Sequence, residues 1–130
     1  MALILLRHPP LLGAEGYCYG RSQPGVVDDT ALGRALAGLQ GFCGLPVSSS
    51  PSPRCLALAQ RLSSAVCIEP ALQELDFGAW EGCRWDDISR TQLDDWAADI
   101  WHYPPGGGES ARQATHFICT NVSIVSSSTY

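Results

Sequence analysis

Short apolar segments alternate with helix-like segments over the first half of the chain, and this alternation constrains the fold more than any other feature. Three apolar runs are expected to form strands, at residues 2–6, 45–49 and 66–68. Between them, helices are expected at residues 31–41, where leucines recur on one face, and at residues 53–64, after a helix-start signal. Strands that alternate with helices are typical of an α/β fold with a parallel sheet. The sequence therefore predicts this class.

Local signals predict where several elements begin. Thr30 is expected to cap the first helix, and Ser52 to cap the second, with Pro53 at its first helical position. Residues 9–29 are rich in Gly and Pro, so we expect a loop there. A further helix is predicted over residues 85–99, because apolar side chains recur along one side of that segment.

Length, charge and cysteine spacing exclude several classes of protein. A chain of 130 residues suits one domain, and a net charge of −5 argues against nucleic-acid binding. The opening apolar run is too short for a membrane span or a signal peptide, so we expect no membrane partner. Without an export signal, the six cysteines are expected to be free thiols in the cytoplasm. Their spacing matches no zinc site.

Charged side chains follow the predicted strands, where parallel α/β sheets bind ligands. Arg7 and His8 follow the first strand, and Arg54 lies in the first turn of the helix after the second strand. Two guanidinium groups near a helix N-terminus favour a phosphoryl group. A neutral His8 between them could attack phosphorus and form a covalent intermediate. Glu74, after the third strand, could protonate the leaving alkoxide and later deprotonate water.

Each of these features also has an ordinary structural explanation. An Arg-His pair after a strand is usually a surface feature, and a glutamate in an acidic stretch is usually solvated. The four tryptophans are expected to pack in the core or in a lid rather than to form a ligand cage. They are Trp80, Trp85, Trp96 and Trp101.

Taken together, four segments resemble the motifs of the histidine phosphatase (phosphoglycerate mutase-like) superfamily, in the family's order. They are Leu-Arg-His-Pro at 6–9, Ser-Ser-Pro-Ser-Pro-Arg-Cys at 49–55, the segment 72–82, and Gly-Gly-Gly-Glu-Ser at 106–110. The resemblance implies a three-layer α/β sandwich with a mostly parallel central sheet. It implies that His8 is the phosphorylated nucleophile, that Glu74 is the acid/base, and that Arg7 and Arg54 bind the phosphoryl group. It implies no metal and no cofactor.

A narrower resemblance suggests the substrate. The sequence Tyr-Cys-Tyr-Gly-Arg-Ser at 17–22 is similar to that of bacterial alpha-ribazole phosphatases, as are residues 85–88 and 101–104. Those enzymes remove the 5′-phosphate of alpha-ribazole phosphate in cobalamin biosynthesis. The resemblance implies a small phosphorylated substrate, and Arg21 could contact its phosphate. Another branch of the family, a broad-specificity phosphatase or a phosphoglycerate mutase, is the alternative.

The chain departs from the family at the second catalytic histidine, which the family places one long helix after the Gly-Gly-Glu-Ser turn. Here His116 follows a Thr, but it lies only six residues after Ser110 and no Gly comes next. Three explanations remain open. His116 takes the second-histidine role after a deletion, or the coding frame or gene is broken near Gln113, or His116 is an ordinary strand residue.

Composition changes in the same region, since no Asp, Glu, Lys or Arg follows Arg112. We therefore expect a histidine-phosphatase-like α/β domain at 1–112, incomplete at its C-terminus, and a divergent tail at 113–130. A missing core strand would leave a sheet edge open and apolar side chains uncovered, which a homodimer could cover. Losing the second histidine would lower the rate about 100- to 1000-fold. A truncated, inactive fragment is thus the alternative to an enzyme.

Overall fold

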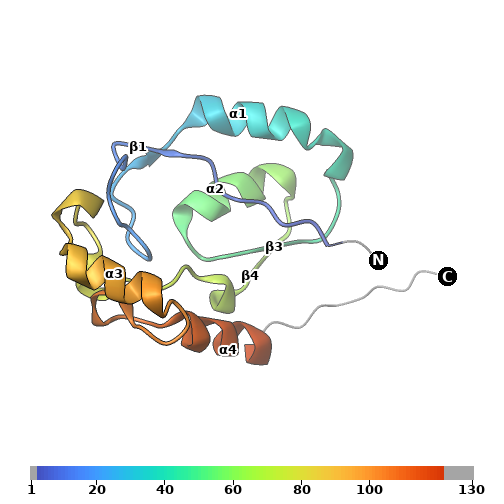
Figure 1. Ribbon diagram of the computed structural model, residues 1–130. Helices are drawn as coiled ribbons and strands as arrows, with labels where there is room; N and C mark the ends of the chain where they lie inside the picture. Colours follow the sequence, from blue (N-terminus) through green and yellow to red (C-terminus); the bar gives the residue numbers. More distant parts are fainter. Residues whose placement is uncertain (1–2, 122–130) are drawn as a thin grey trace.

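A parallel strand pair and the helix that connects its strands lie at the centre of the fold. The computed structural model describes residues 3–121. In it, β3 (Val47–Ser49) pairs in parallel with β4 (Val66–Ile68), and α2 (Pro53–Leu62) connects them. Ser52 is the N-cap of α2 and Pro53 its first residue, as predicted. This unit confirms the α/β class and the parallel pairing (Figure 1).

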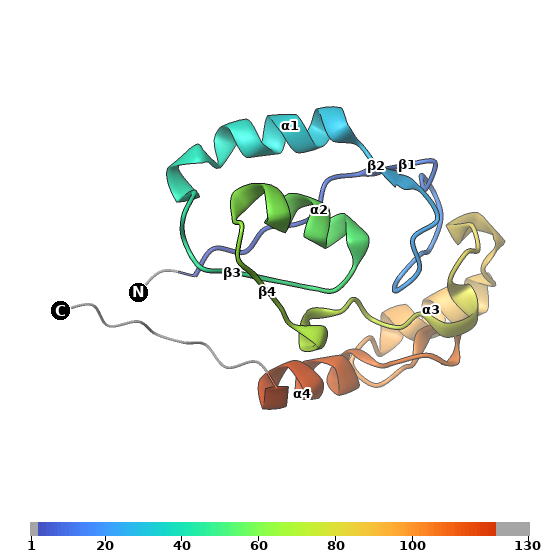
Figure 2. The same ribbon diagram turned by 180° about the vertical axis from the view of Figure 1, so that it is seen from behind.

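The other elements surround this unit. The remaining α-helices are α1 (Asp29–Gly38), α3 (Arg90–Ala98) and α4 (Ala111–Asn121), and the remaining strands are β1 (Leu11–Leu12) and β2 (Val26–Val27). Short 3₁₀ helices lie at Gln40–Phe42, Pro70–Leu72, Gly78–Trp80, Trp85–Asp87 and Pro105–Gly107. Helices α1 and α2 occupy the upper half of the molecule, and α3 and α4 the lower half, in both views (Figures 1 and 2).

The first predicted strand is not formed. Residues 3–10 belong to no strand, and the described strands pair only as β1 with β2 and β3 with β4. A strand needs a neighbour to bond its backbone N–H and C=O groups, and the apolar run has none here. Its side chains are exposed instead, with Leu3 69% and Leu5 84% accessible. This matches the uncovered apolar side chains expected of an incomplete sheet.

Helix α1 begins earlier than expected, because Asp28 and not Thr30 is its N-cap. The Asp28 carboxylate accepts hydrogen bonds of 3.0 Å from the backbone N–H groups of Thr30 and Ala31. The loop predicted upstream of α1 also contains the antiparallel pair β1–β2, in which Leu11 lies opposite Val27. Strands of two residues are too short to leave a periodic pattern in a sequence.

Two hydrophobic clusters form the core. The first, which we call the leucine cluster, consists of the buried side chains Leu32, Leu58 and Leu62 of α1 and α2. The second, which we call the aromatic cluster, consists of three buried side chains and six partly buried ones around them. Its members are Cys18, Trp80 and Ile88, with Phe77, Cys83, Trp85, Leu93, Trp96 and Tyr103 packed against them. Three tryptophans therefore pack in the core, whereas Trp101 is exposed.

The predicted helix over 85–99 is divided into a 3₁₀ helix at Trp85–Asp87 and the shorter α3. The break lets Ile88 turn into the aromatic cluster, where it is buried. The rings of Trp85 and Trp96 stack across this break with centroids 6.3 Å apart. Packing of these large side chains has therefore overridden a continuous helical pattern.

Helix α4 begins directly after the Gly-Gly-Glu-Ser turn. The backbone N–H of Ser110 donates to Gln113 Oε1 at 2.8 Å, and the Gln113 N–H donates to Ser110 Oγ at 3.3 Å. These reciprocal bonds form a capping box, which favours a helix start. His116 lies in this helix, so its interpretation as a strand residue was wrong. The expected boundary between residues 112 and 113 falls within α4 and stays a prediction.

Two further findings concern the described residues. No helix among them is long and apolar enough to cross a bilayer. The five cysteines whose side chains are described are free thiols: Cys18, Cys43, Cys55, Cys67 and Cys83.

Candidate functional site

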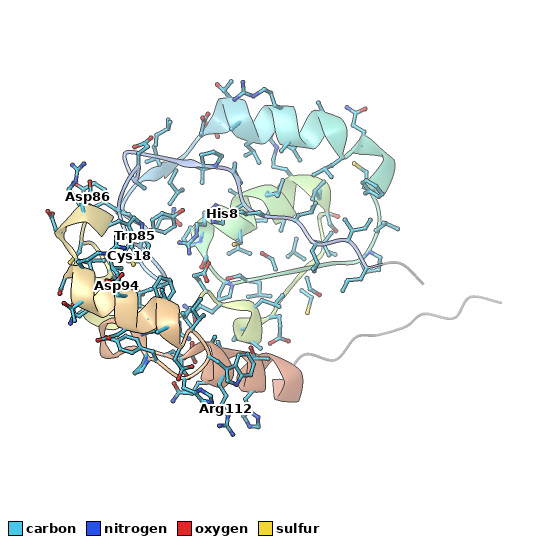
Figure 3. All side chains as sticks on the ribbon, viewed as in Figure 1. His8, Cys18, Trp85, Asp86, Asp94 and Arg112 are labelled. Carbon is cyan, nitrogen blue, oxygen red and sulfur yellow. The ribbon has the colours of Figure 1, made fainter. Side chains whose placement is uncertain are left out.

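His8 is oriented by its own backbone. Its Nδ1 lies 2.7 Å from the carbonyl oxygen of Pro9. A carbonyl oxygen only accepts, so Nδ1 carries the hydrogen in this bond. In the neutral ring, Nε2 then keeps its lone pair. The side chain of His8 is half-buried, and this bond fixes the orientation of its ring (Figure 3).

A hollow of about 520 Å³ lies beside His8. Arg7 and His8 line one part of it, and Leu11, Glu15 and Tyr17 line others. The volume lies within the range of small-molecule sites in proteins. His8 therefore borders a space that could hold a small ligand.

Arg54 carries a positive charge into the interior near this site. It lies in the first turn of α2 with 1% of its surface exposed. Its guanidinium donates to the carbonyl oxygens of Ser22 and Gly20, at 2.9 Å and 2.5 Å. Its Nε is buried without a partner, and none of the ion pairs in the described part of the chain includes it. A buried cation without a balancing carboxylate attracts an anion strongly.

Tyr19 contacts both His8 and the buried Arg54. The guanidinium of Arg54 lies over the Tyr19 ring, 5.0 Å from its centroid. The His8 ring meets the same ring edge to face, with centroids 6.5 Å apart. The sequence singled out Tyr19 only as part of a subgroup motif, and no spacing signal could have shown that it touches both residues.

Arg21 binds carboxylates in this structure. It forms a 3.0 Å ion pair with Glu109 and lies 4.0 Å from Asp76. Its Nε–H donates to the backbone oxygen of Glu74 at 3.0 Å. This one side chain therefore ties together the loop after Tyr19, the Glu74 segment and the Gly-Gly-Glu turn. Its role as a phosphate ligand stays a prediction, since a phosphate would compete with these carboxylates.

Glu81 was not singled out from the sequence, yet it organises the same loop. Its carboxylate accepts hydrogen bonds from the backbone N–H groups of Arg21 (2.9 Å), Ser22 (3.0 Å) and Phe77 (3.2 Å). A carboxylate that accepts several backbone N–H groups holds a turn firmly, because charge-assisted hydrogen bonds are strong. Glu81 lies in an acidic stretch that is typical of a solvated surface, so no sequence signal indicated this role.

The Gly-Gly-Glu turn packs backbone to backbone against the segment after Glu74. The Glu109 N–H donates to the Asp76 carbonyl oxygen at 2.8 Å. Gly78 has a φ of +53°, and a Cβ there would lie 2.3 Å from the Gly106 oxygen. Only glycine permits such a close approach. The Glu74 segment is thus fixed from both sides, by Arg21 and by this turn.

The Glu74 side chain is exposed, and its carboxylate accepts the Leu75 N–H at 3.0 Å. His116 has an exposed side chain on α4, which packs against Pro70–Leu72. It is not among the residues that line the hollow beside His8, and its second-histidine role stays a prediction. Among residues 3–121, no three His, Cys, Asp or Glu side chains are grouped as metal ligands would be.

Known structures share this architecture. The chain matches an alpha-ribazole phosphatase from Shigella flexneri with a TM-score of 0.74 and 22% identity, covering 88% of this chain and 62% of that one. A protein from Thermus thermophilus matches with a TM-score of 0.71 and 23% identity, over 88% of this chain and 66% of that one. A mycobacterial glucosyl-3-phosphoglycerate phosphatase matches with a TM-score of 0.70 and 20% identity, over 85% and 56%. The chain therefore spans about two thirds or less of the length of these proteins.

Comparison at the sequence level gives the family. No curated protein matches the chain. The model of the histidine phosphatase superfamily (branch 1) matches residues 22–116, which include Arg54, Glu74 and the Gly-Gly-Glu-Ser turn. Arg7 and His8 lie upstream of the matched range. Because the match extends over most of the chain, the protein belongs to the histidine phosphatase superfamily, branch 1.

Proposed function

We propose that this chain is a phosphatase that hydrolyses small phosphomonoesters through a phosphohistidine at His8. The observation that carries the proposal is the orientation of His8, whose Nδ1 is bonded to Pro9 and whose Nε2 retains its lone pair beside the hollow. Membership in the histidine phosphatase superfamily supports the same chemistry.

The reaction would proceed in two steps. First, His8 Nε2 attacks phosphorus while the phosphorus–oxygen bond to the leaving group breaks, and a protonated Glu74 gives its proton to the departing alkoxide. Then water attacks phosphorus while the phosphorus–nitrogen bond to His8 breaks, Glu74 takes a proton from that water, and inorganic phosphate leaves. Arg7 and the unpartnered Nε–H of Arg54 would stabilise the charge on the phosphoryl oxygens.

The test is turnover of a simple phosphomonoester by the purified chain, beside His8→Ala. We expect phosphate release only from the parent chain. We also expect an acid-labile, alkali-stable phosphate label on the parent when the reaction is stopped early, and none on His8→Ala. A folded parent chain that neither releases phosphate nor becomes labelled would overturn the proposal.

An inactive fragment is the second candidate, because the chain spans only 62% and 66% of two of the solved structures it resembles. If the chain is active, His116→Ala tests whether His116 takes the second-histidine role. If His116 supplies a donor to the phosphoryl group, the variant should lose about 100- to 1000-fold in rate. An unchanged rate would show that His8 and the arginines work without it.

We further propose alpha-ribazole 5′-phosphate as the substrate, in cobalamin biosynthesis. The motif at residues 17–22 supports this, as does the structural likeness to an alpha-ribazole phosphatase. The alternatives are a broad-specificity phosphatase and a phosphoglycerate mutase. A comparison of kcat/KM for alpha-ribazole 5′-phosphate, 3-phosphoglycerate and a simple alkyl phosphate separates them.

We also propose a cytoplasmic location and a homodimer, with neither nucleic acid nor membrane as a partner. The free thiols of the five described cysteines suit a reducing compartment. The exposed leucines at residues 3–6 offer a surface that a second copy could cover. Sedimentation of the purified chain would test the dimer.

A further inference from the structure

The hollow beside His8 has an uneven chemical lining. Its polar lining residues are Arg7, His8 and Glu15, and the buried Leu11 with Tyr17 and Tyr19 supplies an apolar part. We propose that this apolar part holds the leaving group of the substrate and selects a flat, uncharged group over an anionic one. The inference rests on the proposed phosphatase function, and it assigns specificity to Tyr17 and Glu15.

Tyr17 is held in place from outside the hollow. Its backbone forms an antiparallel bridge with Arg84, and the Arg84 guanidinium lies 5.5 Å from the centroid of the Tyr17 ring. Its N–H also donates to the Ala14 carbonyl oxygen at 3.1 Å. Arg84 does not line the hollow, so it supports the ring from another side. A ring fixed in this way is a preorganised surface on which a flat ligand can stack.

Glu15 gives the hollow a negative charge. Its carboxylate is held at 3.0 Å by the backbone N–H of Gly13. None of the ion pairs found in the described residues includes Glu15, so Arg7 forms no ion pair with it. A leaving group with its own carboxylate or second phosphate would bring a like charge into the same space, at a cost in binding. An uncharged leaving group avoids this repulsion.

Four phosphomonoesters of primary alcohols test the selection, because their leaving groups have related chemistry. They are 2-naphthylmethyl phosphate, benzyl phosphate, n-propyl phosphate and phosphoglycolate. We expect kcat/KM to fall in that order for the parent chain. Equal kcat/KM values for all four would overturn the inference while leaving the proposed phosphatase function intact.

Two variants assign the selection to residues. Tyr17→Leu keeps apolar bulk but removes the flat face, so we expect the preference for naphthylmethyl over propyl phosphate to fall about 5- to 100-fold. Glu15→Gln should raise kcat/KM for phosphoglycolate relative to that for propyl phosphate about 3- to 10-fold, since exposed charges interact modestly. Gln40→Ala, in the 3₁₀ helix Gln40–Phe42 and outside the lining of the hollow, is the control and should change neither ratio. Unchanged ratios in both Tyr17→Leu and Glu15→Gln would overturn the assignment.

Binding without turnover keeps the inference separable from the proposed function. The non-hydrolysable 2-naphthylmethylphosphonate and propylphosphonate can be titrated into the parent chain and into His8→Ala. We expect tighter binding of the naphthyl compound to both proteins, and loss of that difference in Tyr17→Leu. If the chain turns over none of the four esters, the phosphatase proposal fails and this titration decides the inference. Equal affinities, or no binding of either compound, would overturn it.

Discussion

At the scale of single residues, removal of the Arg54 side chain should cost considerable stability. It is buried, and its guanidinium satisfies two backbone carbonyls of the loop at Gly20 and Ser22. Arg54→Ala leaves both carbonyls without donors, so we expect the free energy of unfolding to fall by about 2–4 kcal/mol. Arg61→Ala, exposed in the last turn of the same helix, should change it by less than about 0.5 kcal/mol. Urea unfolding of both variants measures the difference, and equal effects would contradict the assignment.

Cys18 predicts a pH dependence. Burial, followed by the nearby charge of Glu81, raises the pKa of this thiol from 9.0 to about 11. The folded state therefore keeps the proton where the unfolded state loses it, and folding becomes less favourable as pH rises from 9 towards 11. Cys18→Ala should show a shallower loss of stability over this range in urea unfolding. An identical slope in the two proteins would show that other groups cause it.

The candidate-site residues show which parts of the site can be predicted from the sequence. Arg7, His8, Arg54 and Glu74 were proposed from the sequence because charged side chains after predicted strands form a recognisable chemical pattern. Tyr19 and Glu81 were not, because their roles depend on contacts between segments far apart in the chain. A ring contact or a set of backbone hydrogen bonds has no counterpart in residue spacing.

At the scale of elements, the close backbone contact between Gly78 and the Gly-Gly-Glu turn should leave no room for a side chain. Gly78→Ala would place a Cβ 2.3 Å from the Gly106 oxygen, at a positive φ. We expect a loss of more than about 2 kcal/mol in the free energy of unfolding. Gly33→Ala is the matched control, because a Cβ there meets nothing within 4 Å in the middle of α1. That variant should gain about 0.5–1 kcal/mol. Thermal unfolding of the pair would detect the opposite signs, and shifts of the same sign would argue against this packing.

Elements defined by local signals were predictable, and those that depend on neighbours were not. The Ser-Pro start of α2 identified that helix, and the short run at Val66–Ile68 identified β4. The run at residues 2–6 has the composition of a strand but lacks a pairing partner, so composition alone gave the wrong answer. The start of α4 did carry a signal, the Ser110–Gln113 capping box, which the change in composition obscured.

At the scale of the whole molecule, the exposed leucines near the N-terminus should govern association more than stability. Leu5 is 84% exposed, so Leu5→Lys should change the free energy of unfolding by less than about 0.5 kcal/mol. It should also weaken self-association, because it places a charge in the apolar surface. Sedimentation velocity at several concentrations measures this. Unaltered association of Leu5→Lys would place the contact between copies elsewhere. The comparison variant is Leu32→Lys, in the buried leucine cluster, which should prevent folding.

The two hydrophobic clusters have a consequence for how the molecule melts. Arg54 extends from α2, in the leucine cluster, to the loop that continues from Cys18, in the aromatic cluster. The candidate site thus lies between the part of the molecule around the leucine cluster and the part around the aromatic cluster. These two parts could unfold separately. Without a bound anion, calorimetry should give a van't Hoff enthalpy smaller than the calorimetric one, the sign of independent melting. An anion bound at Arg54 would need both parts to be folded. Its binding should therefore make the van't Hoff enthalpy approach the calorimetric enthalpy. Occupancy of the site would then be what makes this short chain behave as one cooperative unit.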